Sequence, residues 1–97
     1  MTSPADVRQA LKAVIDPELG LNIVDLGLIY DVVVEDDAVT IRYSLTTMAC
    51  GLGPIIEQSI KEIAGTLPFA DVRTELVFDP PWSPELISAE GKAFLGI

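Results

Sequence analysis

The chain contains no histidine, only one cysteine and only six basic residues among its 97 residues. The absence of histidine removes the commonest general base and the commonest neutral metal ligand, and it excludes a cysteine–histidine nucleophilic pair. A single cysteine excludes an internal disulfide framework, a closed cysteine-rich zinc site and an iron–sulfur cluster held by this chain alone. Any metal bound through this cysteine would share its ligands with another molecule.

The six basic residues are outnumbered by 15 acidic residues, which gives a formal net charge of −9. This charge would repel nucleic-acid backbones and anionic membranes, so we expect neither as a partner. No apolar run approaches the ~20 residues that a membrane-spanning helix needs. The first residues lack the basic and apolar pattern of a signal peptide, so we expect a reduced, cytoplasmic protein.

The N-terminal half predicts a helix followed by a β-hairpin. Ser3-Pro4-Ala5-Asp6 is a helix start with a serine N-cap, and we expect this helix to end at Pro17, before a turn that reaches Gly20. Alternation of apolar and polar residues from Leu28 to Leu45, broken at Asp36-Asp37, predicts two antiparallel strands.

The C-terminal half predicts a second helix from Pro54, a third strand from Val72 to Phe78 and a final helix after Trp82. A helix between the second and third strands allows them to lie parallel. The length and composition predict one domain over residues 1–97. We therefore expect an α+β two-layer sandwich, with a three-stranded mixed sheet and helices on one face, in the order α-β-β-α-β-α.

The sheet face away from the helices is predicted to carry Ile29, Val33 and Val77. An uncovered apolar patch of this kind would support a homodimer. Scattered surface aliphatic residues are an equally good interpretation.

Cys50 follows the second predicted strand and precedes the second predicted helix. A thiol at a helix N-terminus is favoured as the thiolate, the form that binds metals and attacks electrophiles. Thr46 and Thr47 can donate hydrogen bonds to it, while Gly51 and Gly53 allow the backbone to approach a ligand. A buried cysteine that only packs, and a nearby carboxylate that opposes the thiolate, remain open alternatives.

Asp16, Glu18 and Asp25 flank an otherwise apolar and small segment. Asp16 and Glu18 are most simply solvated acids of a turn, whereas Asp25 lies inside an apolar run and would need hydrogen-bond partners. Trp82, held by the preceding prolines, is expected in the core or as a lid with its N–H satisfied, or else as an anchor for a partner.

These segments together resemble the MIP18 (DUF59) family of iron–sulfur cluster assembly factors. The resemblance spans about Val7 to Gly96 and rests on Asp16-Pro17-Glu18, Asn22 to Tyr30 (NIVDLGLIY), Thr46-Thr47 with Cys50, and Pro80-Pro81-Trp82. The segments from Cys50 to Pro54 and from Val77 to Trp82 are most similar to the SufT-type branch, which is linked to the bacterial SUF system. The resemblance implies that Cys50 is the functional thiol, with Asp16, Glu18, Asp25, Thr46 and Thr47 around it.

Our leading hypothesis is a non-catalytic accessory factor in iron–sulfur cluster assembly or transfer. Cys50 would bind iron or a cluster transiently, with no tightly bound cofactor, and the partners would be other assembly proteins and recipient apoproteins. One alternative is a protein-interaction module in which Cys50 is packed. A cysteine-nucleophile enzyme with Asp25 as base is disfavoured, because a carboxylate of pKa ~3.9 is a poor match for a thiol near ~8.5.

Overall fold

The structure, a computed structural model, describes residues 2–17, 19–45 and 53–96. The elements along the chain are α1 (Pro4–Leu11), β1 (Ile29–Glu35), β2 (Ala38–Tyr43), α2 (Gly53–Ala64), β3 (Asp71–Leu76), the 3-10 helix η1 (Pro84–Leu86) and α3 (Ala89–Leu95). The sheet has the order β1-β2-β3, with β1 antiparallel and β3 parallel to β2. The predicted α+β class, mixed sheet and element order are confirmed.

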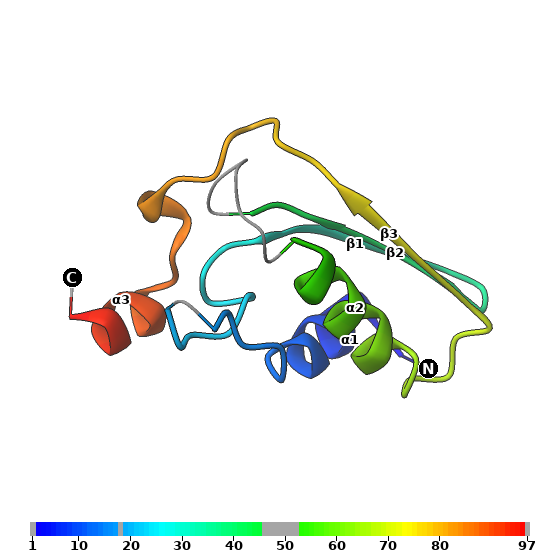
Figure 1. The fold of residues 1–97 in the computed structure, drawn as a ribbon. Coiled ribbons are helices and arrows are strands. Elements are labelled where there is room, and N and C mark those ends of the chain that lie inside the picture. Colours follow the sequence, from blue (N-terminus) through cyan, green and yellow to red (C-terminus); the bar gives the residue numbers. More distant parts are fainter. Residues whose placement is uncertain (1, 18, 46–52, 97) are drawn as a thin grey trace.

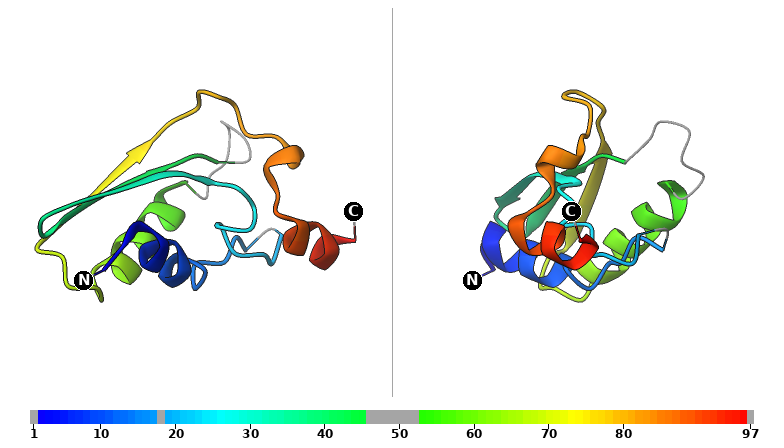
Figure 2. Two further views of the ribbon diagram at one scale, coloured as in Figure 1. Left: turned by 180° about the vertical axis from the view of Figure 1, so that it is seen from behind. Right: turned by 90° about the vertical axis from the view of Figure 1, so that its left-hand side faces the viewer.

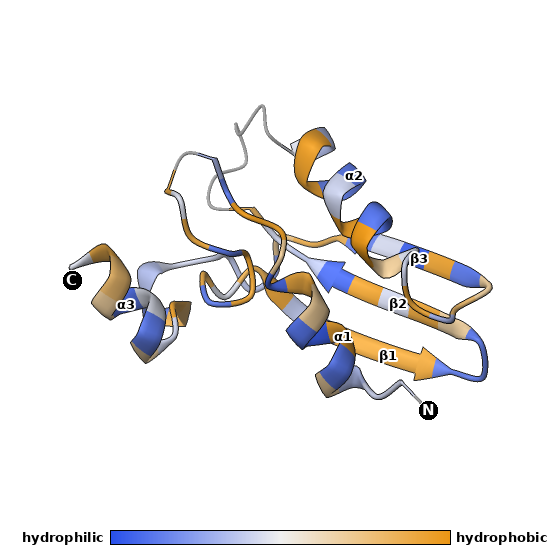
Figure 3. Cartoon of the chain, turned by 90° about the horizontal axis from the view of Figure 1, so that it is seen from below, coloured by the Kyte–Doolittle hydropathy of each residue, from blue (hydrophilic) through white to orange (hydrophobic). Residues whose placement is uncertain are grey.

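Helices α1 and α2 lie together against one face of the sheet, and no described helix covers the other face (Figure 1). The two further views in Figure 2 show the same two layers. On α2, the predicted apolar stripe is buried at Ile56, Ile60 and Ala64, the spacing that places side chains on one helical face. Hydrophobic residues also recur along the strands (Figure 3). None of the described helices is both long and apolar enough to cross a bilayer.

Helix α1 starts as the sequence predicts. The Ser3 hydroxyl accepts a hydrogen bond from the Asp6 backbone N–H at 3.2 Å, and the Asp6 carboxylate accepts one from the Ser3 N–H at 3.0 Å. Pro4 occupies the first helical position, where no backbone donor is needed. This reciprocal capping box satisfies donors that have no partner within the helix.

The predicted end of the first helix is wrong. Helix α1 stops at Leu11, well before Pro17. Ile15 instead forms an isolated antiparallel bridge with Asn22, which gives the backbone hydrogen bonds that a longer helix would have supplied. Ile15 is therefore 50% exposed and does not continue the apolar stripe of α1.

A β-bulge interrupts the alternation of β1. Ile29 pairs with Tyr43 whereas Asp31 pairs with Arg42, so Tyr30 is the extra residue on the β1 side. A bulge reverses which face the preceding residues occupy. Ile29 is consequently 6% exposed and belongs to the core, and the prediction that it faces away from the helices is wrong.

The open face of the sheet is charged. Arg42 lies 3.6 Å from the Asp31 carboxylate and 3.2 Å from that of Glu75, which links the three strands across this face. Val33 is exposed here and Val77 is half-buried, so the predicted three-residue apolar patch does not form. The homodimer remains a prediction, but the apolar patch on which it was based is not present among the described residues.

The third strand is shorter than predicted, ending at Leu76 before Phe78. The N–H of Val77 still donates to the Tyr43 carbonyl at 2.9 Å, and the chain then leaves the sheet. From there it arches over the end of the sheet toward α3 (Figure 1), with a cis peptide bond between Asp79 and Pro80. This course brings the Pro80-Pro81-Trp82 segment back over the turn that precedes β1.

Candidate functional site

Several predicted site residues lie outside the described residues: Glu18, Thr46, Thr47, Cys50 and Gly51. The structure describes Leu45 and Gly53, which bound segment 46–52 in the sequence. Gly53 is buried as the first residue of α2, and a Cβ on it would lie 3.1 Å from Leu45 Cδ1. Close packing between the two ends of the segment therefore favours glycine at residue 53.

The first turn of α2 carries no acidic residue. The first acid along the helix, Glu57, lies 3.1 Å from Lys61 Nζ and accepts a hydrogen bond from the Thr74 hydroxyl at 3.2 Å. The hydrogen bond from Lys61 lowers the pKa of the Glu57 carboxyl, and the charge of Lys61 acts in the same direction. The positive charge of Lys61 thus offsets the negative charge of Glu57. The repulsion between Glu57 and an anion near the α2 N-terminus is therefore limited.

Asp16 shapes the turn that follows the Ile15–Asn22 bridge. Its carboxylate accepts a hydrogen bond from the Leu19 N–H at 3.3 Å, and its carbonyl accepts one from the Gly20 N–H at 2.8 Å. The predicted turn is therefore present, but Asp16 is only 2% exposed and is not a solvated acid. A buried carboxylate needs such donors to offset its desolvation.

Asp25 has the hydrogen-bond partners that the sequence required of it. Its Oδ2 accepts from the Asn22 side-chain amide at 2.7 Å and its Oδ1 accepts from the Ser88 hydroxyl at 3.0 Å. The Asn22 side-chain oxygen in turn accepts from the Asp25 N–H at 2.8 Å. The carboxylate therefore joins the loop before β1 to the start of α3.

Ser88 is a member of this network that sequence reasoning missed. It caps α3 by accepting a hydrogen bond from the Gly91 N–H at 3.0 Å, while its own N–H donates to the Asp25 carbonyl at 2.8 Å. Gly91, which weakens helix propensity, is required here because a Cβ would lie 3.1 Å from the Asp25 carbonyl and 2.8 Å from an Ile87 methyl carbon. A serine before a short helix signals a cap, but no local pattern links it to Asp25 in the sequence.

The surroundings of Asp25 favour its ionised form. The hydrogen bond from Asn22 lowers the pKa of the Asp25 carboxyl, partial burial opposes this, and the Ser88 bond and the charge of Lys12 lower the pKa further. A carboxylate with a lowered pKa is a weaker base at neutral pH. This environment argues further against Asp25 as the general base of a cysteine nucleophile.

We expect Asp25→Asn to destabilise the protein by about 1–2 kcal/mol at pH 7, because charge-assisted hydrogen bonds are replaced by neutral ones. The folded pKa of Asp25 lies below its unfolded value of about 3.9, so the carboxylate contributes stability above about pH 4. This contribution is lost as the pH falls through the folded pKa. Urea denaturation of both proteins at pH 7 and pH 3 should show the difference shrinking at pH 3, and a pH-independent difference would contradict the assignment.

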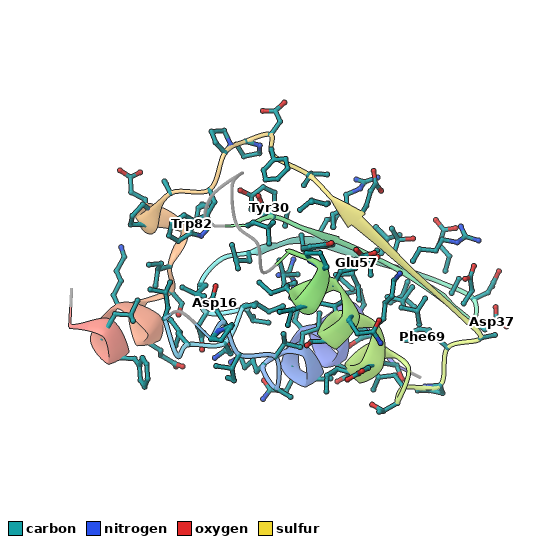
Figure 4. All side chains as sticks on the ribbon, viewed as in Figure 1. Asp16, Tyr30, Asp37, Glu57, Phe69 and Trp82 are labelled. Carbon is teal, nitrogen blue, oxygen red and sulfur yellow. The ribbon has the colours of Figure 1, made fainter. Side chains whose placement is uncertain are left out.

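Two aromatic side chains fasten the segment after β3 to the rest of the fold. The Trp82 indole N–H donates to the Leu26 carbonyl at 2.6 Å, and the Tyr30 hydroxyl donates to the Pro80 carbonyl at 2.8 Å. Trp82 is half-buried and packs against the core. Figure 4 shows Tyr30 and Trp82 beneath the arch of this segment, with Asp16 on the helix side. The expectation that Trp82 is packed with its N–H satisfied agrees with these contacts.

No three acidic or cysteine side chains within residues 2–17, 19–45 and 53–96 are grouped so that they could hold a metal ion. In the network around Asp25, both carboxylate oxygens already accept hydrogen bonds. Asp25 therefore acts here as a structural link between loop and helix.

The chain is similar to several proteins of known sequence or structure. It is 43% identical over 94 residues to the Fe-S protein maturation auxiliary factor YitW of Bacillus subtilis, covering 95% of this chain and 92% of the relative. It is 42% identical over 86 residues to the Fe-S protein maturation auxiliary factor SufT of Staphylococcus aureus, covering 87% of this chain and 98% of the relative. The crystal structure of a DUF59 domain from Bacillus anthracis matches with a TM-score of 0.92 at 34% identity, covering 97% of this chain and 92% of that one.

A family model described as "Iron-sulfur cluster assembly protein" matches residues 4–75. This range contains α1, the β1–β2 hairpin, the loop of Asp16 and Asp25, α2 and most of β3. The match covers well over half of the chain, and the similar folds and sequences above agree with it. The chain belongs to the iron–sulfur cluster assembly protein family, the DUF59 family that the motifs indicated.

Proposed function

We propose that this protein is a non-catalytic accessory factor in the maturation of iron–sulfur proteins. The observation that carries the proposal is the family match over residues 4–75, together with two relatives above 40% identity that are both named Fe-S protein maturation auxiliary factors. These relatives align over nearly the whole chain, so the proposal concerns the protein as a unit.

In this proposal Cys50 is the residue that contacts the iron or cluster being transferred. The first turn of α2, which follows Cys50 in the sequence, lacks acids, and Glu57 is paired with Lys61. Both features favour an anionic thiolate over a neutral thiol near this helix. Thr46, Thr47 and loop N–H groups would supply the hydrogen bonds that steady the sulfur.

A single thiolate is too few ligands for a stable cluster, so binding would be transient and shared. The remaining ligands would come from another assembly protein, a recipient apoprotein or a small thiol. The proposed setting is the cytoplasm, where thiols are kept reduced.

The in vivo test replaces Cys50 by serine in a strain that lacks the native copy. We expect the activities of iron–sulfur enzymes to fall to the level of the strain without the protein, because serine lacks a thiolate. Ala93→Ser is the matched control, since it introduces the same side chain at an exposed residue of α3. Unchanged activities in the Cys50→Ser strain would show that the thiol is not needed for this function.

Two measurements on the purified protein separate the possible roles of Cys50. After anaerobic incubation with iron, sulfide and a small thiol, native mass measurement should show an added mass on the wild type that Cys50→Ser lacks. The rate of thiol alkylation at pH 7 should exceed that of an unfolded peptide, as expected for a thiol of lowered pKa. An alkylation rate no faster than the peptide's would support a packed cysteine in an interaction module.

A further inference from the structure

A pocket of about 450 Å³ lies between α1, the start of β1 and the segment that follows β3. Its walls are formed by Arg8, Val24, Gly27, Ile29, Tyr30, Pro80 and Leu86, and we name it the Arg8 pocket. Sites for small ligands typically have volumes of about 300–1,000 Å³, mostly apolar walls and a few polar groups. The volume of the Arg8 pocket lies within this range, and its described wall combines apolar side chains with one charged group. None of the described residues in this wall was assigned to the thiol site.

Among the residues that the structure describes, Arg8 is the only charged one in the wall of the pocket. Its Nη1 donates to the Ile29 carbonyl at 3.2 Å, and its side chain is half-buried. A guanidinium carries five N–H donors in a planar fork that matches a carboxylate. The bond to the Ile29 carbonyl uses one of these donors, so the guanidinium retains the capacity to bind an anion.

The other arginines of the chain are already paired with acids. Arg42 contacts Asp31 and Glu75, and Arg73 contacts Asp71 at 2.7 Å. Among the ion pairs of the described residues none involves Arg8, although the chain has 15 acidic residues and six basic ones. An anionic ligand would give this half-buried cation the carboxylate partner that the described residues do not supply.

A bulge in β1 and a glycine in the preceding turn shape the wall of the pocket. The β-bulge of β1 takes Tyr30 out of the strand pairing, and the Tyr30 hydroxyl then holds Pro80 in the wall at 2.8 Å. Bulges are frequent beside binding sites because they re-aim a side chain. Gly27, also in the wall, lets the backbone of Leu86 approach closely.

We propose that the Arg8 pocket binds a small organic anion, with one carboxylate on an apolar alkyl or aryl body. The carboxylate pairs with the Arg8 guanidinium, and the body packs on Val24, Ile29 and Leu86. Charge selects the ligand, because an apolar wall alone would accept neutral and cationic molecules of the same shape.

The test titrates the ¹⁵N-labelled full-length protein with sodium octanoate at pH 7 and follows the amide signals. We expect saturable shifts at Gly27, Tyr30 and Leu86. 1-Octanol, which has the same body without the charge, should bind about tenfold or more weakly, and octylammonium should not saturate the site. Equal binding of octanol and octanoate, or shifts confined to other residues, would overturn the proposal.

Two single substitutions test whether the charge of Arg8 is the one that binds the carboxylate. Arg8→Gln should weaken octanoate binding by about tenfold or more, whereas Lys92→Gln, which removes a cation outside the pocket, should change it by less than about twofold. Equal weakening by both variants would indicate non-specific attraction and contradict the proposal. If Arg8→Gln does not fold, Leu86→Glu decides, because Leu86 is 42% exposed and a carboxylate there should repel the ligand. Unchanged binding by Leu86→Glu would also refute it.

Discussion

Gly27→Ala is expected to lower the free energy of unfolding by about 2–5 kcal/mol, through two separate costs. The backbone of Gly27 has φ = +79°, a left-handed conformation that costs an L-residue about 1–2 kcal/mol. A Cβ would also overlap the carbonyl oxygen of Leu86 and lie 2.8 Å from its carbonyl carbon. Backbone atoms cannot rotate away as a side chain can, so η1 must shift. Urea denaturation followed by circular dichroism measures the loss.

Gly20→Ala is the matched control for this prediction. Gly20 has a similar φ of +71°, but nothing lies within 4 Å of the Cβ position. We therefore expect it to cost only the conformational part, about 1–2 kcal/mol. The difference between the two variants measures the close approach of Leu86. Equal losses would show that this approach is not the reason for glycine at residue 27.

Ile60→Ala is expected to destabilise the fold by about 2–5 kcal/mol. Ile60 is fully buried in the middle of α2 and belongs to the core cluster between the helices and the sheet. Its truncation removes buried apolar atoms and leaves a cavity that the neighbouring side chains fill only in part. Small domains have a total stability of about 5–15 kcal/mol, so the loss is a large share of it. The midpoint of urea denaturation should fall accordingly, with little change in the slope.

Ile55→Ala separates burial from helix propensity on the same helix. Ile55 is 57% exposed, and alanine is the better helix former, so we expect a change within about 0.5 kcal/mol. A loss as large as that of Ile60→Ala would mean that Ile55 is buried in solution. The melting temperature would then depend on protein concentration, as expected for a homodimer that covers this residue.

The parts of the fold that the sequence predicted correctly depend on neighbours along the chain. The capping box of Ser3 and Asp6 requires only residues within one helical turn. The hairpin follows from alternation, and the stripe of α2 follows from helical spacing. These signals are local, so they can be identified without knowing what packs against them.

The two wrong predictions, the face of Ile29 and the end of the first helix, concern places where pairing with another segment sets the backbone conformation. Alternation alone placed Ile29 outward, but the bulge at Tyr30 turned Ile29 into the core. Helical spacing alone extended the first helix past Leu11, but pairing of Ile15 with Asn22 replaced the helical hydrogen bonds. A bulge or a bridge depends on the tertiary environment, which overrides weak local preference.

In the candidate site too, a partner close in the sequence could be predicted and a distant one could not. The sequence predicted that Asp25 would need hydrogen-bond partners, and the structure supplied Asn22 and Ser88. Asn22 is a near neighbour within a recognisable motif. Ser88 is 63 residues away, and nothing in the local pattern indicates that its hydroxyl meets this carboxylate.

The α+β class, the order of elements and the similarity to an iron–sulfur assembly family could all be predicted from the sequence, because periodicity, capping and motif spacing depend on residues close together in the chain. The tertiary structure was needed to place Ile29 in the core, to link Asp25 with Ser88 and to put Arg8 in a pocket whose described wall residues include no acid. These features depend on contacts between segments far apart in the chain, such as Trp82 with Leu26 and Tyr30 with Pro80. Such contacts form only when the whole chain has closed around its core, since their free energy must exceed the entropy of bringing distant segments together.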